Sequence, residues 1–280
     1  MYYLKYLKFL SLAVLIIHNC SLTGTDEKST TANPVIISYN WEKENQIQDR
    51  WEQFLDFYNA ATMDKGTIFM KPTSYLMQTY FENNLPKIIP DSITSSNKED
   101  FIPDLLGFYE KWQDLFGCKV ENLEFERLDD YSLYGNYFNY RFEQVKLNNR
   151  RVKFVYRRWI RFRVNTNGEL LQIVSALYPD VEIEKPEKAY IHNMIHSTMG
   201  YKHKFHLSGS SIMYPDHEFT SKDSYNIKDD FEIYLQYTEN KAYVYYLKGI
   251  KYYWIEDDHN YKCTIYYHPE TTEKILVSIY

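Results

Sequence analysis

The sequence predicts an α+β protein in which antiparallel sheets are each packed by one or more helices. Apolar residues recur every three or four positions in the first part of the chain, and every second position in most segments after it. The aromatic content is 18%, with 29 Tyr, and aromatic residues favour pleated, half-buried surfaces. A compositional bias of the genome would also raise the Tyr count. The 280 residues suffice for one large domain or two small ones.

The beginning of the chain has the pattern of a targeting signal. Two lysines precede the apolar run FLSLAVLII, which has the length of a secretory signal peptide and is too short to span a membrane. Cys20 follows, as in the signal of bacterial lipoproteins, and the polar stretch after it resembles that of Bacteroidetes surface lipoproteins. We predict a signal peptide over residues 1–19, lipidation of Cys20 and a flexible tether over residues 20–34. Simple secretion and a structural cysteine are the alternatives.

The net charge and the cysteines narrow the choice of partners and compartment. The formal net charge is −6, whereas proteins that bind nucleic acid usually carry a basic footprint, so no nucleic-acid partner is expected. Two further cysteines, Cys118 and Cys263, lie in the body of the chain. Outside the cytoplasm they could pair, and two buried free thiols are an equal alternative.

Three helices are predicted ahead of the strands. Residues 41–62 and 100–117 place their apolar side chains at spacings of three and four, and a shorter helix is predicted for residues 72–85. Two prolines and a Ser/Asn cluster then predict a loop before residue 100. Residues 35–100 are therefore expected to form a helical N-terminal segment.

Alternating apolar residues predict strands from Cys118 onward. The predicted strands cover residues 118–128, 133–147, 150–164 and 168–177, and later 231–237, 241–250 and 260–280, the last with its own hairpin. The sequence Asn-Thr-Asn-Gly at 165–168 predicts the turn before the fourth strand, because Asn and Gly adopt positive φ. A helix is predicted between the two groups of strands, over residues 185–201, with Pro186 in its first turn.

A family resemblance rests on the first group of strands. Tyr140 to Gln144 form one element, Arg161 to Leu170 form a strand, a turn with Gly and a second strand, and Pro179 follows. This order resembles the FTP domain, the propeptide of fungalysin- and thermolysin-like metalloproteases. The Gly-Ile-Pro-Val turn of that family is replaced by KLNNRRV, with Asn148 and Asn149 as turn candidates. The resemblance implies an FTP-like domain over residues 101–183.

The second half extends this resemblance. It contains a helix, a gap, strands, and a final strand–turn–strand from Thr264 to Leu276, which resembles the PepSY domain that follows FTP in those propeptides. Residues 184–280 are thus expected to be a PepSY-like domain. The chain contains no His-Glu-x-x-His, the zinc-binding motif of the proteases themselves. The resemblance therefore implies two consecutive propeptide-like modules, preceded by the helical segment, that act without a protease domain.

The densest positive charge lies within residues 150–163, where arginines and a lysine are interleaved with aromatic residues. Such a strand could bind an acidic partner or a glycan. The predicted binding residues are Tyr156, Arg158, Trp159, Arg161 and Arg163. The alternative is a solvated sheet face whose charge is balanced by Glu residues of neighbouring strands.

Candidates for metal binding and catalysis are few. His192 and His196 lie four residues apart on a predicted helix and could bind zinc with a third ligand, although an exposed polar helix face is preferred. No Gly-x-Ser-x-Gly motif occurs, and Cys118 ends a helix, where the helix dipole does not activate a thiolate. We therefore expect that the protein is not an enzyme and that it binds neither a metal nor a cofactor.

The preferred function is that of a non-enzymatic lipoprotein of the cell envelope that binds another protein. The resemblance implies a protease inhibitor or folding helper, with an envelope or secreted protein as its partner and an extracellular metalloprotease as the specific candidate. The alternative is a surface lipoprotein that binds a glycan or small ligand through an aromatic and basic sheet face. The predicted location is the outer membrane, on its periplasmic or surface side, with membrane contact through the lipid anchor only.

Overall fold

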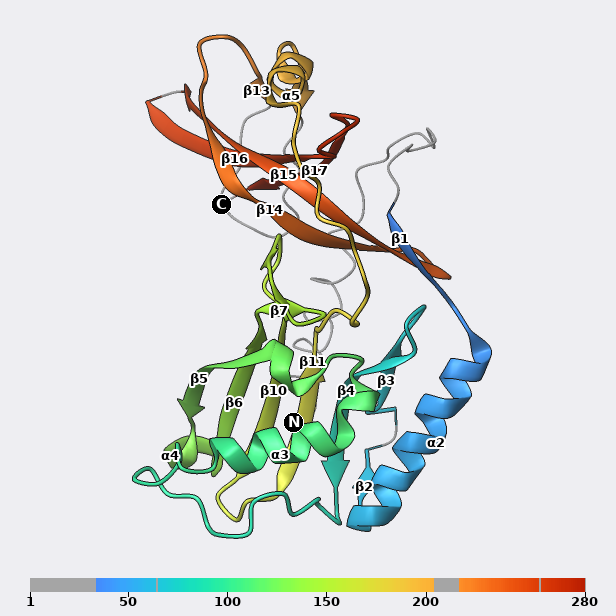
Figure 1. Cartoon of the computed structure of the whole chain (residues 1–280). Helices are drawn as coiled ribbons and strands as arrows, with labels where there is room; N and C mark the ends of the chain where they lie inside the picture. Colours follow the sequence, from blue (N-terminus) through green and yellow to red (C-terminus); the bar gives the residue numbers. More distant parts are fainter. Residues whose placement is uncertain (1–33, 64, 204–216, 257, 280) are drawn as a thin grey trace.

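The computed structural model describes residues 34–63, 65–203, 217–256 and 258–279. The structure is mixed α+β with antiparallel sheets, which confirms the predicted fold class (Figure 1). Two large sheets dominate the described part of the chain. The first sheet has the order β2-β4-β11-β10-β6-β5 with β3 beside β4, and the second has the order β17-β16-β15-β14-β9 with β1 beside β15.

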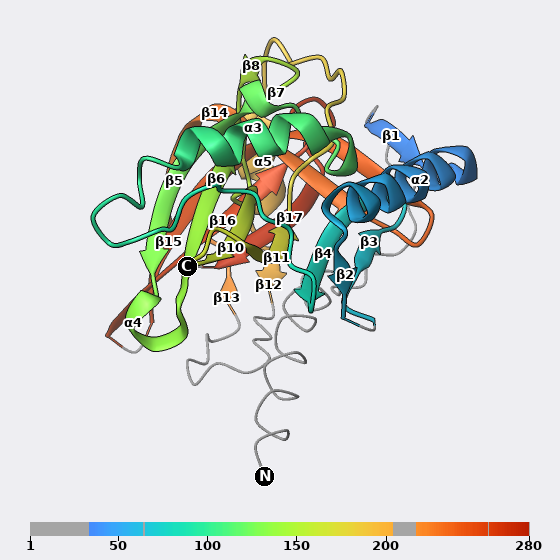
Figure 2. The ribbon, with the colours of Figure 1, turned by 90° about the horizontal axis from the view of Figure 1, so that it is seen from below.

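The first sheet is packed by two helices. Its strands are β2 (Ala61–Thr62), β3 (Ile68–Met70), β4 (Tyr75–Glu82), β5 (Leu123–Asp130), β6 (Tyr137–Gln144), β10 (Trp159–Asn165) and β11 (Leu170–Ser175). Helices α2 (Trp41–Tyr58) and α3 (Ile102–Trp112) both lie against one face of the sheet (Figure 2), and the short α4 (Ser132–Gly135) joins β5 to β6. The ring of Phe108 on α3 packs edge-on against Phe162 of β10 at 5.6 Å, and Phe54 of α2 meets Trp112 at 5.0 Å. The apolar stripes predicted for both helices thus form the core.

The predicted Asn-Thr-Asn-Gly turn joins β10 to β11. The Asn165 side-chain carbonyl accepts hydrogen bonds from the backbone N–H groups of Asn167 (3.0 Å) and Glu169 (2.9 Å). Gly168 has a φ of 80°, and a Cβ there would lie 2.3 Å from the carbonyl oxygen of Ile89. Glycine is therefore required both by the backbone conformation and by the close approach of a neighbouring loop.

The helix predicted for residues 72–85 is wrong, because these residues form strand β4. Leu76, Thr79 and Phe81 are buried on this strand, which covers Tyr75–Glu82. The strand forms because β11 offers a pairing edge, with Gln172 opposite Tyr80. Such long-range pairing overrides local pattern.

The expectation of a separate helical segment over residues 35–100 is correct only for α2. Strands β2, β3 and β4 complete the first sheet, and β1 (Val35–Ser38) pairs with β15 of the second sheet. The chain before residue 100 therefore contributes to both sheets.

The second sheet consists mainly of long strands. They are β14 (Ser224–Tyr237), β15 (Lys241–Glu256), β16 (His259–Tyr267) and β17 (Lys274–Ile279), with the two-residue β9 (Lys153–Phe154) at one edge. The predicted final hairpin is present as β16 and β17. Two-residue strands also form the pairs β7 (Lys146–Leu147) with β8 (Arg150–Arg151) and β12 (Lys202–His203) with β13 (His217–Glu218).

Helix α5 (Ile191–Thr198) packs on one face of the second sheet through Met194, which is fully buried among residues that include Tyr252 and Tyr267 (Figure 1). The helix begins six residues later than predicted, since residues 185–190 are not helical. The hydroxyl of Thr198 is hydrogen-bonded both to the Met194 carbonyl and to Tyr267, which fixes the end of the helix against the sheet.

Tyr178 joins the two sheets. The side-chain amide of Gln144, at the end of β6, bonds to both the N–H (2.8 Å) and the C=O (3.1 Å) of Tyr178. Its hydroxyl accepts the backbone N–H of Leu235 in β14 (2.9 Å) and a guanidinium N–H of Arg158 (2.6 Å). Its ring packs against Phe154 of β9 at 5.0 Å. One residue thus bonds to both sheets, through its backbone to the first and through its hydroxyl to the second, while only 1% of its surface is exposed.

Replacing Tyr178 with Phe is expected to destabilise the protein by about 1–3 kcal/mol, because the buried N–H of Leu235 loses its acceptor. Urea unfolding followed by intrinsic fluorescence measures this change. Tyr134→Phe, the same chemical change at a side chain that is 92% exposed, is the control and should leave the midpoint unchanged. Equal midpoints for the two variants would contradict the role given to the Tyr178 hydroxyl.

Candidate binding surface on the first sheet

Strand β10 places three of the five predicted binding residues on one face of the first sheet. Trp159, Arg161 and Arg163 alternate with residues that are fully buried beneath the helices. None of the described helices packs on the opposite face (Figure 2). Strand register adds residues from β6 and β11 to this face. We call it the polar face, and it includes Tyr137, Asn139, Arg141, Glu143, Trp159, Arg161, Arg163 and Gln172.

The other two predicted binding residues lie elsewhere. The guanidinium of Arg158 stacks over the ring of Tyr178, 4.0 Å from its centroid, at the junction of the two sheets. The ring of Tyr156 packs edge-on against Tyr234 of the second sheet at 6.1 Å. The predicted set is therefore divided between a sheet face and the junction.

Part of the basic stretch is neutralised, as the alternative interpretation expected. Glu126 pairs with two guanidiniums, those of Arg141 (2.6 Å) and Arg157 (3.0 Å). Glu124 pairs with Arg151 at 3.1 Å. These pairs balance the charge along the β5 side of the sheet.

Arg161 and Arg163 differ from these neighbours. Within the part of the chain that the structure describes, each guanidinium bonds to a neutral amide: Arg161 to Gln172 (3.4 Å) and Arg163 to Asn139 (3.2 Å). Neither forms an ion pair with a described carboxylate, and Arg161 Nε is buried without a described hydrogen-bond partner. Burial lowers the pKa of Arg161, and the charge of Arg163 lowers it further. Partly buried charges are normally paired with an opposite charge. Among the described residues, Arg161 and Arg163 are exceptions to this rule.

Aromatic rings of the polar face lie against two of its guanidiniums. Arg141 lies 4.7 Å from the centroid of Trp159, and Arg163 lies 4.5 Å from that of Tyr137. A flat guanidinium presents its N–H groups as a fork that matches a carboxylate, phosphate or sulfate. The arrangement is chemically suited to bind an anionic group.

Sequence reasoning missed the two amides of the polar face. Asn139 is 4% exposed and Gln172 is 3% exposed, so both are interior parts of the surface rather than solvated side chains. Their position follows from strand alternation once the register is known, because each lies opposite Arg163 on a neighbouring strand. The alternation was visible in the sequence, but the strand partners were not.

The two candidate metal ligands lie on the exposed side of α5. The ring centroids of His192 and His196 are 6.5 Å apart. Among the described residues, no group of three or more His, Cys, Asp and Glu side chains is placed to hold a metal ion.

Cys118 and Cys263 are free and buried, so the free-thiol alternative is the one found. Cys118 belongs to the core of the first sheet and Cys263 to the core under α5. Burial raises the pKa of Cys118 far above its usual range and that of Cys263 to about 12. The predicted lipidation site, Cys20, lies outside the described residues, as does the predicted signal peptide. No described helix combines the length and apolar character needed to cross a membrane.

Comparison with known proteins identifies no family for this chain. No protein-family profile and no curated protein matches the chain. Among solved structures, the C-terminal domain of YpeB from Bacillus megaterium superposes on 86% of this chain and 98% of that domain, with a TM-score of 0.30 and 10% sequence identity. A superposition at this score establishes neither a family nor a function.

The thiols are expected to be inert in the folded protein. With Cys20 replaced by Ser, Ellman's reagent at pH 8 should not react measurably with the native chain, because the thiolate form is suppressed at both buried sites. In guanidinium chloride, both remaining thiols should react. Rapid reaction of the native chain would contradict the burial, and failure to react after denaturation would indicate a disulfide.

Proposed function

We propose that this chain is a non-enzymatic binding protein of the cell envelope that docks an acidic segment of another protein on its polar face. The observation that carries the proposal is the pair Arg161 and Arg163, two adjacent, partly buried guanidiniums whose described partners are neutral amides. A carboxylate from a partner would supply the missing counter-charge. By contrast, Arg141, Arg151 and Arg157 have carboxylate partners within the chain.

A protein partner is favoured over the glycan alternative by the composition of the surface. Arginine, tryptophan and tyrosine are the residues most enriched at the energetic centres of protein interfaces. The polar face combines Arg161 and Arg163 with Trp159 and Tyr137 on regular strands, so the rings and guanidiniums are ordered before binding. Ordered side chains lose less entropy when a partner docks.

The sequence resemblance supplies the most specific partner. Propeptides of the FTP and PepSY type bind the proteases that they accompany, so a secreted metalloprotease of the thermolysin type is the partner that we propose. The lipoprotein-like pattern around Cys20 would hold the protein at the outer membrane, where secreted proteases pass. In this view the protein inhibits the protease or assists its folding, and uses no metal or cofactor of its own.

Thermolysin, immobilised for biolayer interferometry, provides the test. The wild-type chain should bind, and the double variant Arg161→Gln/Arg163→Gln should bind at least about tenfold more weakly, since hydrogen-bonded charge pairs at the centre of an interface contribute 2 kcal/mol or more. Binding should also weaken as salt is raised.

Arg127→Gln/Arg151→Gln is the matched control. It removes the same charge from two arginines that are exposed and already paired, with Asp129 and Glu124. This variant should retain binding within about threefold, as expected for exposed ion pairs. Loss of binding in both double variants would show that binding depends on the net charge of the protein and not on Arg161 and Arg163, and would contradict the proposal. Binding to alginate or heparin but not to thermolysin would contradict the proposed protein partner and support an acidic glycan as the ligand.

A further inference from the structure

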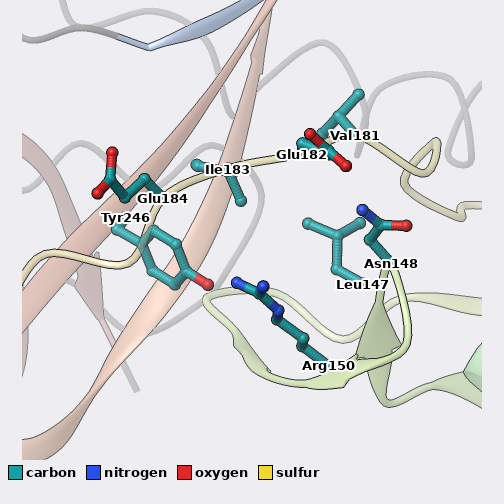
Figure 3. A pocket seen from close by; sticks show the side chains of 8 residues that line it. All are labelled: Leu147, Asn148, Arg150, Val181, Glu182, Ile183, Glu184 and Tyr246. Atoms are coloured by element: carbon teal, nitrogen blue, oxygen red, sulfur yellow. The ribbon is translucent and has the colours of Figure 1, made fainter.

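A cavity of about 360 Å³ lies where the two sheets meet. Three segments surround it: the β7–β8 hairpin, residues 181–184 of the chain that crosses between the sheets, and strand β15 (Figure 3). Its volume falls within the range of about 300–1,000 Å³ that is typical of small-ligand sites. The polar face lies on different residues, so this cavity is independent of the surface described above.

One end of the cavity presents two hydrogen-bond donors. Arg150 and the hydroxyl of Tyr246 extend toward one another from the hairpin and from β15 (Figure 3). Burial raises the pKa of Tyr246, and the nearby charge of Arg150 opposes this rise, so the phenol remains a donor at neutral pH. Arg150 forms no ion pair with the described residues, whereas the next residue, Arg151, pairs with Glu124. A guanidinium beside a phenol is suited to bind a carboxylate.

The hairpin that carries Arg150 is held rigidly. Asn148 and Asn149 both have positive φ, at 49° and 63°, which is the type I′ geometry of a two-residue turn. The N–H of Asn149 donates to the side chain of Asn122 (3.1 Å), whose amide donates to Asp180 (2.7 Å). The backbone of the hairpin is therefore fixed before any ligand arrives.

Apolar side chains form the centre of the cavity. Leu147 is 3% exposed and Tyr246 is 9% exposed, and Ile183 is half-buried beside them. The lining also includes the exposed carboxylates of Glu182 and Glu184, and neither forms an ion pair with the described residues. The cavity thus combines a cationic end, an apolar centre and free carboxylates.

We propose that this cavity binds short apolar peptides with free termini, such as dipeptides. The peptide carboxylate bonds to Arg150 and Tyr246, the apolar side chains cover Leu147 and Ile183, and the terminal ammonium pairs with Glu182 or Glu184. A simple anion is repelled by the two glutamates, and a simple cation by Arg150, so the site selects a zwitterion. Because its walls come from the β7–β8 hairpin, the crossing chain and β15, a bound peptide also links these three segments.

Isothermal titration calorimetry of the full chain with the dipeptide Leu-Leu tests the proposal. Leu-Leu should bind, while N-acetyl-Leu-Leu, Leu-Leu amide and Ser-Ser should each bind at least about tenfold more weakly, because each lacks one charged terminus or the apolar side chains. Arg150→Gln should weaken Leu-Leu binding by a similar factor, and Glu182→Gln/Glu184→Gln should remove the preference for the free amine.

Arg151→Gln is the control, since it removes the adjacent arginine of the same hairpin and should leave Leu-Leu binding unchanged. Near-UV circular dichroism verifies that each variant is folded, and Arg150→Lys serves as the second variant: it keeps the charge without the fork and should bind more weakly than wild type. No heat of binding with Leu-Leu at millimolar concentration, or equal binding by Arg150→Gln and wild type, would overturn the proposal.

Discussion

The arrangement of the whole molecule depends on Tyr178, because this residue ties the end of β6 to the last part of β14. Its backbone groups are bonded by Gln144, its hydroxyl by Leu235 and Arg158, and its ring by Phe154. When a buried polar group loses its hydrogen-bond partner, the loss in stability is larger than the net contribution of the bond. The contacts of Tyr178 therefore favour one relative placement of the two sheets. The cavity beside the junction exists only because that placement is kept.

The polar face depends on a second constraint, the register of β10. Strand side chains alternate, so a slip of one residue would turn Arg161 and Arg163 toward α3 and expose Phe162. Burying two guanidiniums without carboxylates is far more costly than exposing an apolar ring. The Asn165–Gly168 turn prevents the slip. A slip would bring a residue with a side chain to the position of Gly168, where a Cβ would collide with the backbone of Ile89. The core of the first sheet and its candidate binding surface are therefore two consequences of one register.

Local pattern predicted the elements whose partners are close in sequence. The stripe of α3, the alternation of β10 and β11, the turn between them and the final hairpin can all be derived from spacing and turn chemistry. Strand β4 could not, because its conformation depends on β11, which lies about ninety residues further along the chain. The same applies to β1 and β9, which are short and join the second sheet through partners far away in sequence.

The binding residues illustrate the same limit at the level of single side chains. The sequence contains adjacent arginines at 150–151 and at 157–158, which together look like one basic patch. In each pair, one arginine is neutralised by a glutamate of β5. Its neighbour lines the cavity in the first pair and bonds to Tyr178 in the second. Composition records only the total charge, whereas pairing decides where charge is available to a ligand. The basic stretch is therefore three separate features: a junction contact, a polar face with two uncompensated guanidiniums, and one wall of a cavity.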